Sequence, residues 1–384
     1  MSAIVIDLKK TEDPRDVVHR AVQALVEGEL VVFPTETVYG IAANALCPEA
    51  VERLVHVKGR DPKKPLALAI KSSDEALDYA PSMSSAACRL SRRCWPGPLT
   101  LVVDNDHPDS ALGQLAQSVQ KYLSPEGTLG FRVPAHPIIM EVLRLCPAPM
   151  VLSSANRSGA GDAVSGDAVI GDLSDEVHLI INDGVCRFAK ASSVVKVVGS
   201  EIQLLREGVL DLAAIKQLAG WLGIVVCTGN TCRSPMAEAI LRNLLAKRLG
   251  CAPDELIGRG VTIASAGIAA MEGSLVSIES VEAMASRQID ISAHLSQPLT
   301  ERLVRFADLI LTMTRGHREA IVGQWPETSM RTHLLSQSSR DIADPIGGSA
   351  EIYERCAQQI EDELTGWVET IDLDDLPNFV NEGA

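Results

Sequence analysis

Short apolar runs alternate with longer amphipathic stretches along the second part of the chain. This pattern predicts strands over residues 223–226, 261–265 and 308–313, and helices to about residue 249, over 277–287, from residue 315 and over 350–371. Strands that alternate with helices are typical of a parallel, doubly wound sheet. In such a sheet, ligands bind beyond the carboxyl ends of the strands.

The first part of the chain has a less regular pattern. A helix is predicted from Asp13-Pro14 to about Glu27, because apolar residues recur there on one helical face. Residues 105–127 are polar and are expected to form an irregular, mobile flap. Strands are predicted over residues 3–8, 30–33, 66–70, 98–103, 128–133, 150–152, 177–182, 193–198 and 202–206, the last two as a hairpin. An α/β or α+β domain follows from this order.

Length and composition favour two globular domains. The chain has 384 residues, and single hydrophobic cores stop growing near ~250–300 residues. An apolar share of 46% is ordinary for globular proteins. We expect one domain over residues 1–208, a linker over 209–220, a second domain over 221–371 and an acidic, frayed tail over 372–384.

Charge and cysteine content narrow the function classes. The net charge of −15 disfavours general binding of nucleic acid, although a local basic site remains open. Nine cysteines without paired spacing indicate reduced thiols rather than a disulfide framework. The apolar runs are too short for a membrane helix or a signal segment. We therefore expect a cytoplasmic protein with no membrane partner.

One loop in the second part predicts an anion cradle. Cys227 follows the apolar strand 223–226, and Arg233 stands six residues later, at the start of a helix. Backbone N–H groups of such a loop converge on an anion, and the arginine adds a planar fork for two phosphate oxygens. These surroundings can lower a cysteine pKa from about 8.5 to roughly 3.5–7.5. Cys227 is thus a candidate nucleophile aimed at phosphorus, and Ser234-Pro235 is the expected helix cap.

The loop, with Ser265-Ala266-Gly267 and Asp344-Pro345, resembles the low-molecular-weight protein-tyrosine-phosphatase family over about residues 222–370. The resemblance implies that Asp344 is the general acid and later the base for water, beside Cys227 and Arg233. Cys232 either closes a reversible disulfide with Cys227 or is simply buried. The implied phosphate loop and its support comprise Thr228, Gly229, Asn230, Thr231, Cys232, Ser234 and Ser265.

Two positions bear on the phosphatase substrate. Thr231 and the segment Asp344-Pro345-Ile346-Gly347-Gly348-Ser349 resemble the protein-arginine-phosphatase branch. The glycines in this segment make no aromatic wall for the phenol ring of a phosphotyrosine. A threonine hydroxyl and a carboxylate suit a guanidinium group. We favour phosphoarginine on a protein over phosphotyrosine. Arsenate reductase ranks lower, because Cys251 and Cys356 do not form the further cysteine pair that it needs.

Polar and cationic residues follow several predicted strands of the first part. Residues 58–65 hold four cations and two prolines directly before a buried strand, where they suit a polyphosphate or form an ordinary solvated loop. Arg132 lies inside an apolar strand and requires a carboxylate or phosphate partner. We expect His136 to cap a helix. These residues together predict a cleft lined by cations.

Several motifs in order resemble the threonylcarbamoyl-AMP synthase family over residues 17–208. They are Pro34 to Gly40, Lys58-Gly59-Arg60, Arg132 to Pro137, Ser154-Ala155-Asn156 and Ser192 to Val195. The resemblance implies a twisted mixed sheet around a deep cationic cleft. It also implies that L-threonine, bicarbonate and ATP give threonylcarbamoyl-AMP and pyrophosphate, for N6-threonylcarbamoyladenosine in tRNA. Other machinery transfers the group, so tRNA is an indirect partner.

The same resemblance assigns residues to substrates. Mg²⁺ is expected on the ATP phosphates, with no metal site made by the protein alone. Ala69 stands where many members carry a histidine, and the phosphatase-like part takes the place of an additional C-terminal domain in longer members. An RNA- or nucleotide-binding module is the alternative. The implied ATP contacts are Lys58, Arg60, Lys64, Thr128, Ser154, Asn156 and Arg206, and the implied threonine contacts are Thr37, Arg132 and Ser192.

Overall fold

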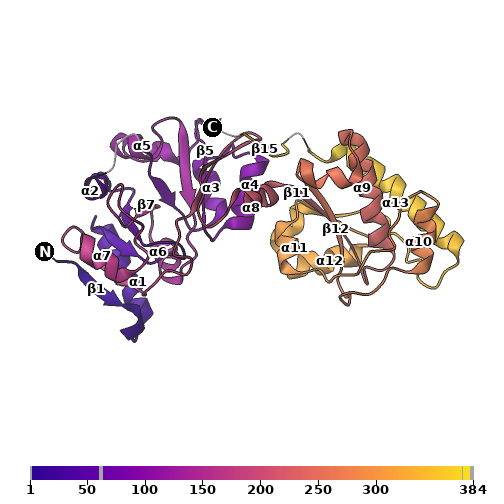
Figure 1. Cartoon of the computed structure of the whole chain (residues 1–384), viewed down its shortest axis with the longest axis horizontal. Coiled ribbons are helices and arrows are strands. Elements are labelled where there is room, and N and C mark those ends of the chain that lie inside the picture. The colour runs from indigo at the N-terminus through magenta and orange to yellow at the C-terminus, as the bar shows by residue number, and fades with distance from the viewer. Residues whose placement is uncertain (1, 60–63, 374, 381–384) are drawn as a thin grey trace. The chain divides into compact units, whose positions relative to one another are not determined.

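The computed structural model describes residues 2–59, 64–373 and 375–380 (Figure 1). The chain divides into two compact units. Unit 1 comprises Met1–Leu218 together with Asn378–Ala384, and unit 2 comprises Ala219–Pro377. Unit 2 is therefore inserted along the chain between two segments of unit 1. In the described part of the chain, no helix is both long and apolar enough to span a bilayer.

Unit 1 is built on a mixed sheet of eleven strands within the described residues, in the order β1-β8-β2-β3-β7-β4-β6-β5-β9-β10-β15. Strand β4, for example, pairs parallel with β6 and antiparallel with β7. The mixed sheet predicted for this part is confirmed. The strands are β1 Ile4–Asp7, β2 Val31–Phe33, β3 Gly40–Asn44, β4 Ala67–Ala69, β5 Leu99–Asp104, β6 Thr128–Arg132, β7 Met150–Ser154, β8 Leu179–Asn182, β9 Ser193–Val198, β10 Glu201–Arg206 and β15 Asn378–Phe379.

The first helix shows how the sequence builds unit 1. Asp13 caps helix α1 by accepting a 2.9 Å hydrogen bond from Arg15 N, and Pro14 opens the first turn. Its apolar face is buried, as predicted. The other helices are α2 Pro48–Lys58, α3 Ser73–Tyr79, α4 Ser85–Cys94, α5 Gln117–Leu123, α6 Pro137–Leu145, α7 Gly166–Leu173 and α8 Leu212–Ala219, after α1 Pro14–Val26, with short 3₁₀ helices η1 Leu8–Lys10 and η2 Ala111–Gln114.

Two segments of unit 1 differ from the predicted elements. Residues 105–127 were expected to be irregular, but they contain η2 and α5. Val119 and Leu123 of α5 are fully buried, and their burial stabilises a helix that the polar composition hides. Strand β3 was not predicted, because Gly40 and Asn44 interrupt its apolar run. All five of its residues are nevertheless buried in the centre of the sheet.

The expected fraying of the acidic tail is wrong for residues 378–380. Asn378 and Phe379 form β15, which pairs parallel with β10. Backbone N–H groups of Asn378 and Val380 donate to Ser200 O at 2.8 Å and to Ile202 O at 3.1 Å. Strand β10 offers unpaired backbone N–H and C=O groups with which residues 378–380 can pair. The acidic composition of the tail does not reveal this pairing. The Phe379 ring also packs under Lys216 Nζ, 5.4 Å from the ring centroid.

Unit 2 has a parallel sheet in the order β12-β11-β13-β14. Its centre is β11, in which Val226 lies opposite Ala266 of β12 and Thr312 of β13. This register places the carboxyl ends of three strands side by side. The doubly wound parallel sheet predicted for this part is confirmed. The strands are β11 Trp221–Cys227, β12 Val261–Gly267, β13 Leu309–Thr312 and β14 Thr332–Leu334.

Helices cover both faces of the unit 2 sheet (Figure 1). Val225 packs in the core that α9, α10 and α13 share, whereas Ile224 and Val226 pack in the core shared with α11 and α12. Successive residues of β11 thus point to opposite faces. The helices are α9 Arg233–Leu249, α10 Ile278–Ala285, α11 Glu301–Phe306, α12 Arg315–Gln324 and α13 Ala350–Thr370, with 3₁₀ helices η3 Pro253–Glu255, η4 Ile257–Arg259 and η5 Pro326–Arg331.

The two ends of unit 2 meet at one turn. Trp221 N donates to Gly260 O at 2.7 Å, which fixes the start of β11. Pro377, the last residue of the unit, lies against the same glycine, because a Cβ atom on Gly260 would stand 3.0 Å from Pro377 Cγ. Gly260 has a φ of +76°, a conformation that glycine adopts without strain.

Candidate active sites

The loop that follows β11 closes around the sulfur of Cys227. Cys227 ends the strand, and α9 begins at Arg233. Asn230 adopts the left-handed conformation with a φ of +55°, which turns its backbone N–H toward Cys227 Sγ at 3.2 Å. Ser234 Oγ lies 3.0 Å from the same sulfur. Cys227 is only 3% exposed, and hydrogen-bonding groups surround its sulfur.

Asn230 fixes the shape of this cradle. Its Nδ2 donates to Ser234 Oγ at 2.9 Å and to Ser265 Oγ at 2.8 Å, and its Oδ1 accepts from Gln297 N at 2.8 Å. Ser265 in turn donates to Glu238 at 2.7 Å. A buried network in which each polar group is paired holds the loop rigidly. Ser234 is not the helix cap that we expected, because α9 starts before it and its hydroxyl faces Cys227.

Arg233 and Asp344 meet beside the cradle. Arg233 is buried, and its NH1 donates to Ile342 O at 3.0 Å. Its NH2 pairs with Asp344 Oδ2, while Asp344 Oδ1 accepts from Ile346 N at 3.2 Å. The Asp344 side chain is 44% exposed, so it can reach solvent and an incoming substrate. The fold thus brings Asp344, which is distant in sequence, to Arg233, in the loop segment that also holds Cys227.

The second cysteine of the loop is buried against α13. Cys232 Sγ lies 3.7 Å from Thr231 Oγ1 and 3.7 Å from Tyr353 OH. Burial, together with the contact to Cys232, raises the pKa of Tyr353 to about 12, so its hydroxyl stays protonated at neutral pH. Cys227 and Cys232 are both free thiols in this structure. Gly229 and Thr231 complete the loop between them.

Gly267 lets β12 pass close under the phosphate loop. A Cβ atom at this position would stand 2.5 Å from Thr228 O and 3.0 Å from Asn230 N. We predict that Gly267→Ala lowers kcat/KM for any reaction at Cys227 by about ten- to a hundredfold, because it displaces groups that position a ligand in the cradle. The matched control is Gly258→Ala, since nothing lies within 4 Å of a Cβ there. Equal rates for both variants would contradict a rigid cradle.

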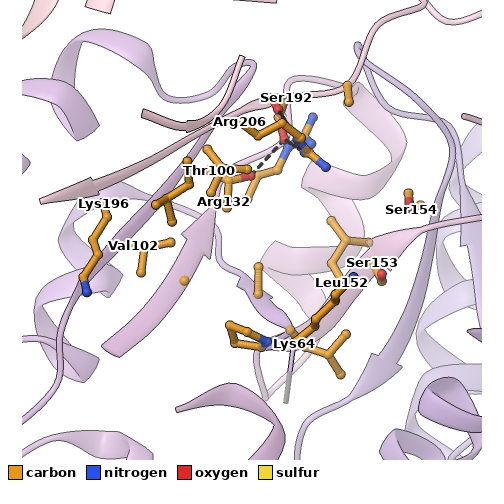
Figure 2. Close-up of a pocket in the computed structure, with 18 of the residues that line it drawn as sticks. Lys64, Thr100, Val102, Arg132, Leu152, Ser153, Ser154, Ser192, Lys196 and Arg206 are labelled. Atoms are coloured by element: carbon orange, nitrogen blue, oxygen red, sulfur yellow. Dashed lines mark hydrogen bonds between the residues drawn. The ribbon is translucent and has the colours of Figure 1, made fainter. Parts of the chain in front are cut away.

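Unit 1 contains a cavity of about 760 Å³ over the sheet (Figure 2). It is lined by residues from β3 to β7, β9 and β10, including Lys64, Thr128, Arg132, Ser154, Ser192 and Arg206. These six residues were assigned to substrates from the sequence, and the fold brings them to one cavity. Figure 2 shows Arg132, Ser192 and Arg206 at one end and Lys64 at another. Lys196 and Glu126 also line the cavity.

Arg132 is held on one edge of its guanidinium group. Its NH2 donates to Glu36 Oε1 at 2.8 Å and contacts Thr37 Oγ1. Glu36 Oε2 accepts from Ala135 N at 2.8 Å, so both carboxylate oxygens are engaged. Arg132 Nε is buried without a hydrogen-bond partner among the described residues. An arginine with one fixed edge and an unpaired Nε at a cavity wall is poised for an anion. Thr37, by contrast, does not line the cavity.

Ser192 links Arg206 to the sheet. Arg206 NH2 donates to Ser192 O at 2.9 Å, and Ser192 Oγ lies 2.9 Å from Thr100 Oγ1 (Figure 2). Burial lowers the pKa of Arg206, and Arg132 acts in the same direction while Asp162 opposes it. Two guanidinium groups near each other at one end of the cavity favour a bound anion there.

Lys58, which the sequence predicts to contact ATP, bonds to a neighbouring segment of unit 1. Its ammonium group is buried and donates to Ser154 O at 2.6 Å and to Asn156 Oδ1 at 3.0 Å. It therefore fastens the segment 154–156 to the end of α2. Neither Lys58 nor Asn156 lines the cavity. Arg60 lies outside the described residues.

We expected His136 to cap a helix, but its side chain does not cap α6. It occupies the N-cap position but makes no cap hydrogen bond. Its Nε2 instead lies 3.2 Å from Asp183 Oδ2. Pro137 occupies the first helical position, where its missing N–H leaves one donor fewer to be paired at the helix end. The ring is thus free to pair with a carboxylate from β8's end.

Some site residues give little sequence signal. Glu36, Thr100 and Lys196 are ordinary polar residues in the sequence, although Glu36 lies within a motif that was singled out. His317, on α12, places Nε2 2.9 Å from Thr228 Oγ1 in the phosphate loop. Their partners lie far away in the chain, so spacing alone cannot identify them.

Family models match the two units separately. The Sua5-YciO-YrdC model, described as telomere recombination, matches residues 23–208. The low molecular weight phosphotyrosine protein phosphatase model matches residues 224–376.

Relatives of known name match each part. A putative threonylcarbamoyl-AMP synthase of Mycobacterium tuberculosis is 36% identical over 203 residues, covering 52% of this chain and 88% of that protein. The protein-arginine-phosphatase of Bacillus subtilis is 37% identical over 145 residues, covering 37% of this chain and 90% of that protein.

A larger relative extends beyond the match. The threonylcarbamoyl-AMP synthase of Pyrococcus abyssi is 36% identical over 200 residues, which cover 52% of this chain and 56% of that protein. A solved structure of a Pyrococcus abyssi Sua5 variant aligns with a TM-score of 0.51 at 30% identity, covering 65% of this chain and 76% of that one. The chain therefore belongs to two families, joining a Sua5-YciO-YrdC synthase domain to a low-molecular-weight phosphatase domain.

Proposed function

We propose that this chain is a bifunctional enzyme with one activity in each unit. Unit 1 forms L-threonylcarbamoyl-AMP from L-threonine, bicarbonate and ATP and releases pyrophosphate. Unit 2 removes phosphate from phosphoproteins, with phosphoarginine as the favoured residue. The names of the relatives that match each part support this division.

The observation that carries the synthase proposal is the partly fixed Arg132 at the cavity wall. Glu36 fixes one edge of its guanidinium group, and Nε is left without a partner among the described residues. A threonine carboxylate would accept a hydrogen bond from this Nε. Ser192, beside Arg206, would orient the amino acid, and Thr37 would act through Arg132, which it contacts.

Nucleotide contacts follow from the remaining lining. Arg206 and Lys64 would offset phosphate charge, while Thr128 and Ser154 would hydrogen-bond the nucleotide. Lys58 and Asn156 would act through the 154–156 segment, and the role of Arg60 stays a prediction. Mg²⁺ would be held by the ATP phosphates and water. The threonylcarbamoyl group then passes to tRNA through separate machinery.

The test of unit 1 is pyrophosphate release by the full chain. Release should require ATP, bicarbonate and threonine together, because a carbamate of threonine must attack the α-phosphorus. Controls omit each substrate in turn. Release that does not depend on threonine would reject the synthase and leave a nucleotide- or RNA-binding unit.

Unit 2 is proposed to act through a phosphocysteine. The Cys227 thiolate attacks phosphorus, the bond from phosphorus to the leaving nitrogen breaks, and Asp344 protonates that nitrogen. Water activated by Asp344 then attacks phosphorus, and the bond to sulfur breaks. Phosphate must first take the place of Asp344 Oδ2 on Arg233, because the two are paired without ligand.

The favoured leaving group is a guanidinium. Residues 346–349 after Asp344 carry no aromatic side chain, and Ile346 is 71% exposed. We expect kcat/KM for a phosphoarginine protein to exceed that for a phosphotyrosine peptide by about tenfold or more. One or two hydrogen bonds to the charged guanidinium group would account for a difference of this size. Equal or faster cleavage of phosphotyrosine would contradict this preference.

A further inference from the structure

The first turn of α12 brings a buried histidine to the phosphate loop. Strand β13, which precedes α12, lies beside β11, which precedes the phosphate loop. Both turns therefore leave the sheet at the same edge. Thr314 caps α12 by accepting a hydrogen bond from His317 N at 3.2 Å. This cap holds the backbone of His317, from which the imidazole ring extends.

His317 is buried and has one partner on the loop. The side chain is 6% exposed, and Nε2 lies 2.9 Å from Thr228 Oγ1. Nδ1 is buried without a hydrogen-bond partner among the described residues. Burial lowers the pKa of His317, Arg233 adds to this effect, and Asp344 and Asp341 oppose it. The ring is therefore neutral at pH 7 and carries one N–H.

The orphaned Nδ1 decides which nitrogen carries that hydrogen. A buried N–H without an acceptor is rarer in proteins than a buried acceptor without a donor. The hydrogen therefore belongs on Nε2, which donates to Thr228 Oγ1. The hydroxyl hydrogen of Thr228 then cannot point at the ring and must donate elsewhere. Thr228 is next to Cys227 in the loop, and a phosphoryl group bound at Cys227 would offer this hydrogen an acceptor.

We propose that His317 is a positioning residue that directs the Thr228 hydroxyl hydrogen toward the phosphoryl group in unit 2. This inference rests on the proposed phosphatase function. It adds a donor to the cradle besides the backbone N–H groups and Arg233. It also gives Thr228 a role in binding phosphate, separate from the choice of leaving group.

A first experiment measures the tautomer in the full chain without any substrate. Nitrogen-15 correlation spectra of the histidine side chains distinguish hydrogen on Nε2 from hydrogen on Nδ1. His317→Gln identifies the signal by removing it. We expect the Nε2–H form for His317. A hydrogen on Nδ1, or a doubly protonated ring at pH 7, would overturn the proposal.

A second experiment tests the coupling with inorganic phosphate as the probe. Calorimetric affinities are compared for Thr228→Val, His317→Leu and the double variant, all of which leave unit 1 unchanged. Each single variant should weaken phosphate binding by about tenfold, the effect of one hydrogen bond to a charged group. The double variant should bind phosphate no more weakly than Thr228→Val alone.

The conservative variant separates positioning from packing. His317→Gln keeps an N–H near the Nε2 position and should bind phosphate within about threefold of the wild type. If His317→Leu costs as much in the Thr228→Val background as in the wild type, the proposal is wrong. Phosphate affinity does not require turnover, so a chain without phosphatase activity would reject the proposed function and still decide this inference.

Discussion

Replacing Cys227 with serine is expected to abolish phosphatase turnover and to leave threonine-dependent pyrophosphate release unchanged. Serine keeps the size of the side chain and the contacts with Asn230 N and Ser234 Oγ. It does not form an anion at neutral pH, so the attack on phosphorus is lost. We expect kcat to fall by at least about a thousandfold, as removal of a catalytic nucleophile does. Both rates are measured on the full chain.

Cys251→Ser is the matched control, because Cys251 is a free thiol just beyond the C-terminal end of α9, whereas the phosphate loop precedes the N-terminal end. It should retain both activities. Residual phosphatase turnover above about 0.1 per cent in Cys227→Ser would mean that another group attacks phosphorus. Loss of pyrophosphate release as well would reject the assignment of one activity to each unit.

Arg132→Met should have the largest effect on unit 1. The pair with Glu36 is buried, with side chains 9% and 5% exposed, so the variant leaves a buried carboxylate without its counter-ion. We expect a loss of roughly 3–5 kcal/mol in unfolding free energy. The KM for threonine should rise by about a hundredfold, if Arg132 binds the carboxylate. Calorimetric unfolding and pyrophosphate release measure the two effects.

The double variant Arg132→Met/Glu36→Gln separates stability from binding. It removes both buried charges and should recover most of the stability, but not the affinity for threonine. Arg144→Met is the control, because it breaks an exposed pair with Glu141 and should cost less than about 1 kcal/mol. A double variant with normal affinity for threonine would remove Arg132 from the substrate site.

Local patterns predicted much of the fold. The cap and apolar face of α1, the hairpin of β9 and β10, and the strand, loop and helix around Cys227 each lie within a short stretch of sequence. Helix α5 and strand β3 could not be predicted in this way, because long-range burial rather than local pattern stabilises them. The pairing of β15 likewise depends on an edge that is distant in the chain.

The candidate sites also contain some residues that local sequence pattern predicts and others that only distant contacts reveal. The residues of the phosphate loop follow one another in sequence, so their spacing predicts the cradle. Asp344 was predicted as the general acid only through a family resemblance, and the fold places it beside Arg233. The role of Lys58 in holding residues 154–156, and the contact of His317 with Thr228, join segments about a hundred residues apart. Such contacts need the fold itself.

The meeting of both ends of unit 2 at Gly260 bears on how the whole chain acquires its structure. Strand β15 can join the sheet of unit 1 only after the chain has passed through unit 2. With the insert unfolded, joining would close a loop at an entropic cost on the order of 4 kcal/mol. Folding of the insert brings Trp221 and Pro377 to one turn and removes most of that cost. Completion of the synthase sheet is thus thermodynamically linked to folding of the phosphatase.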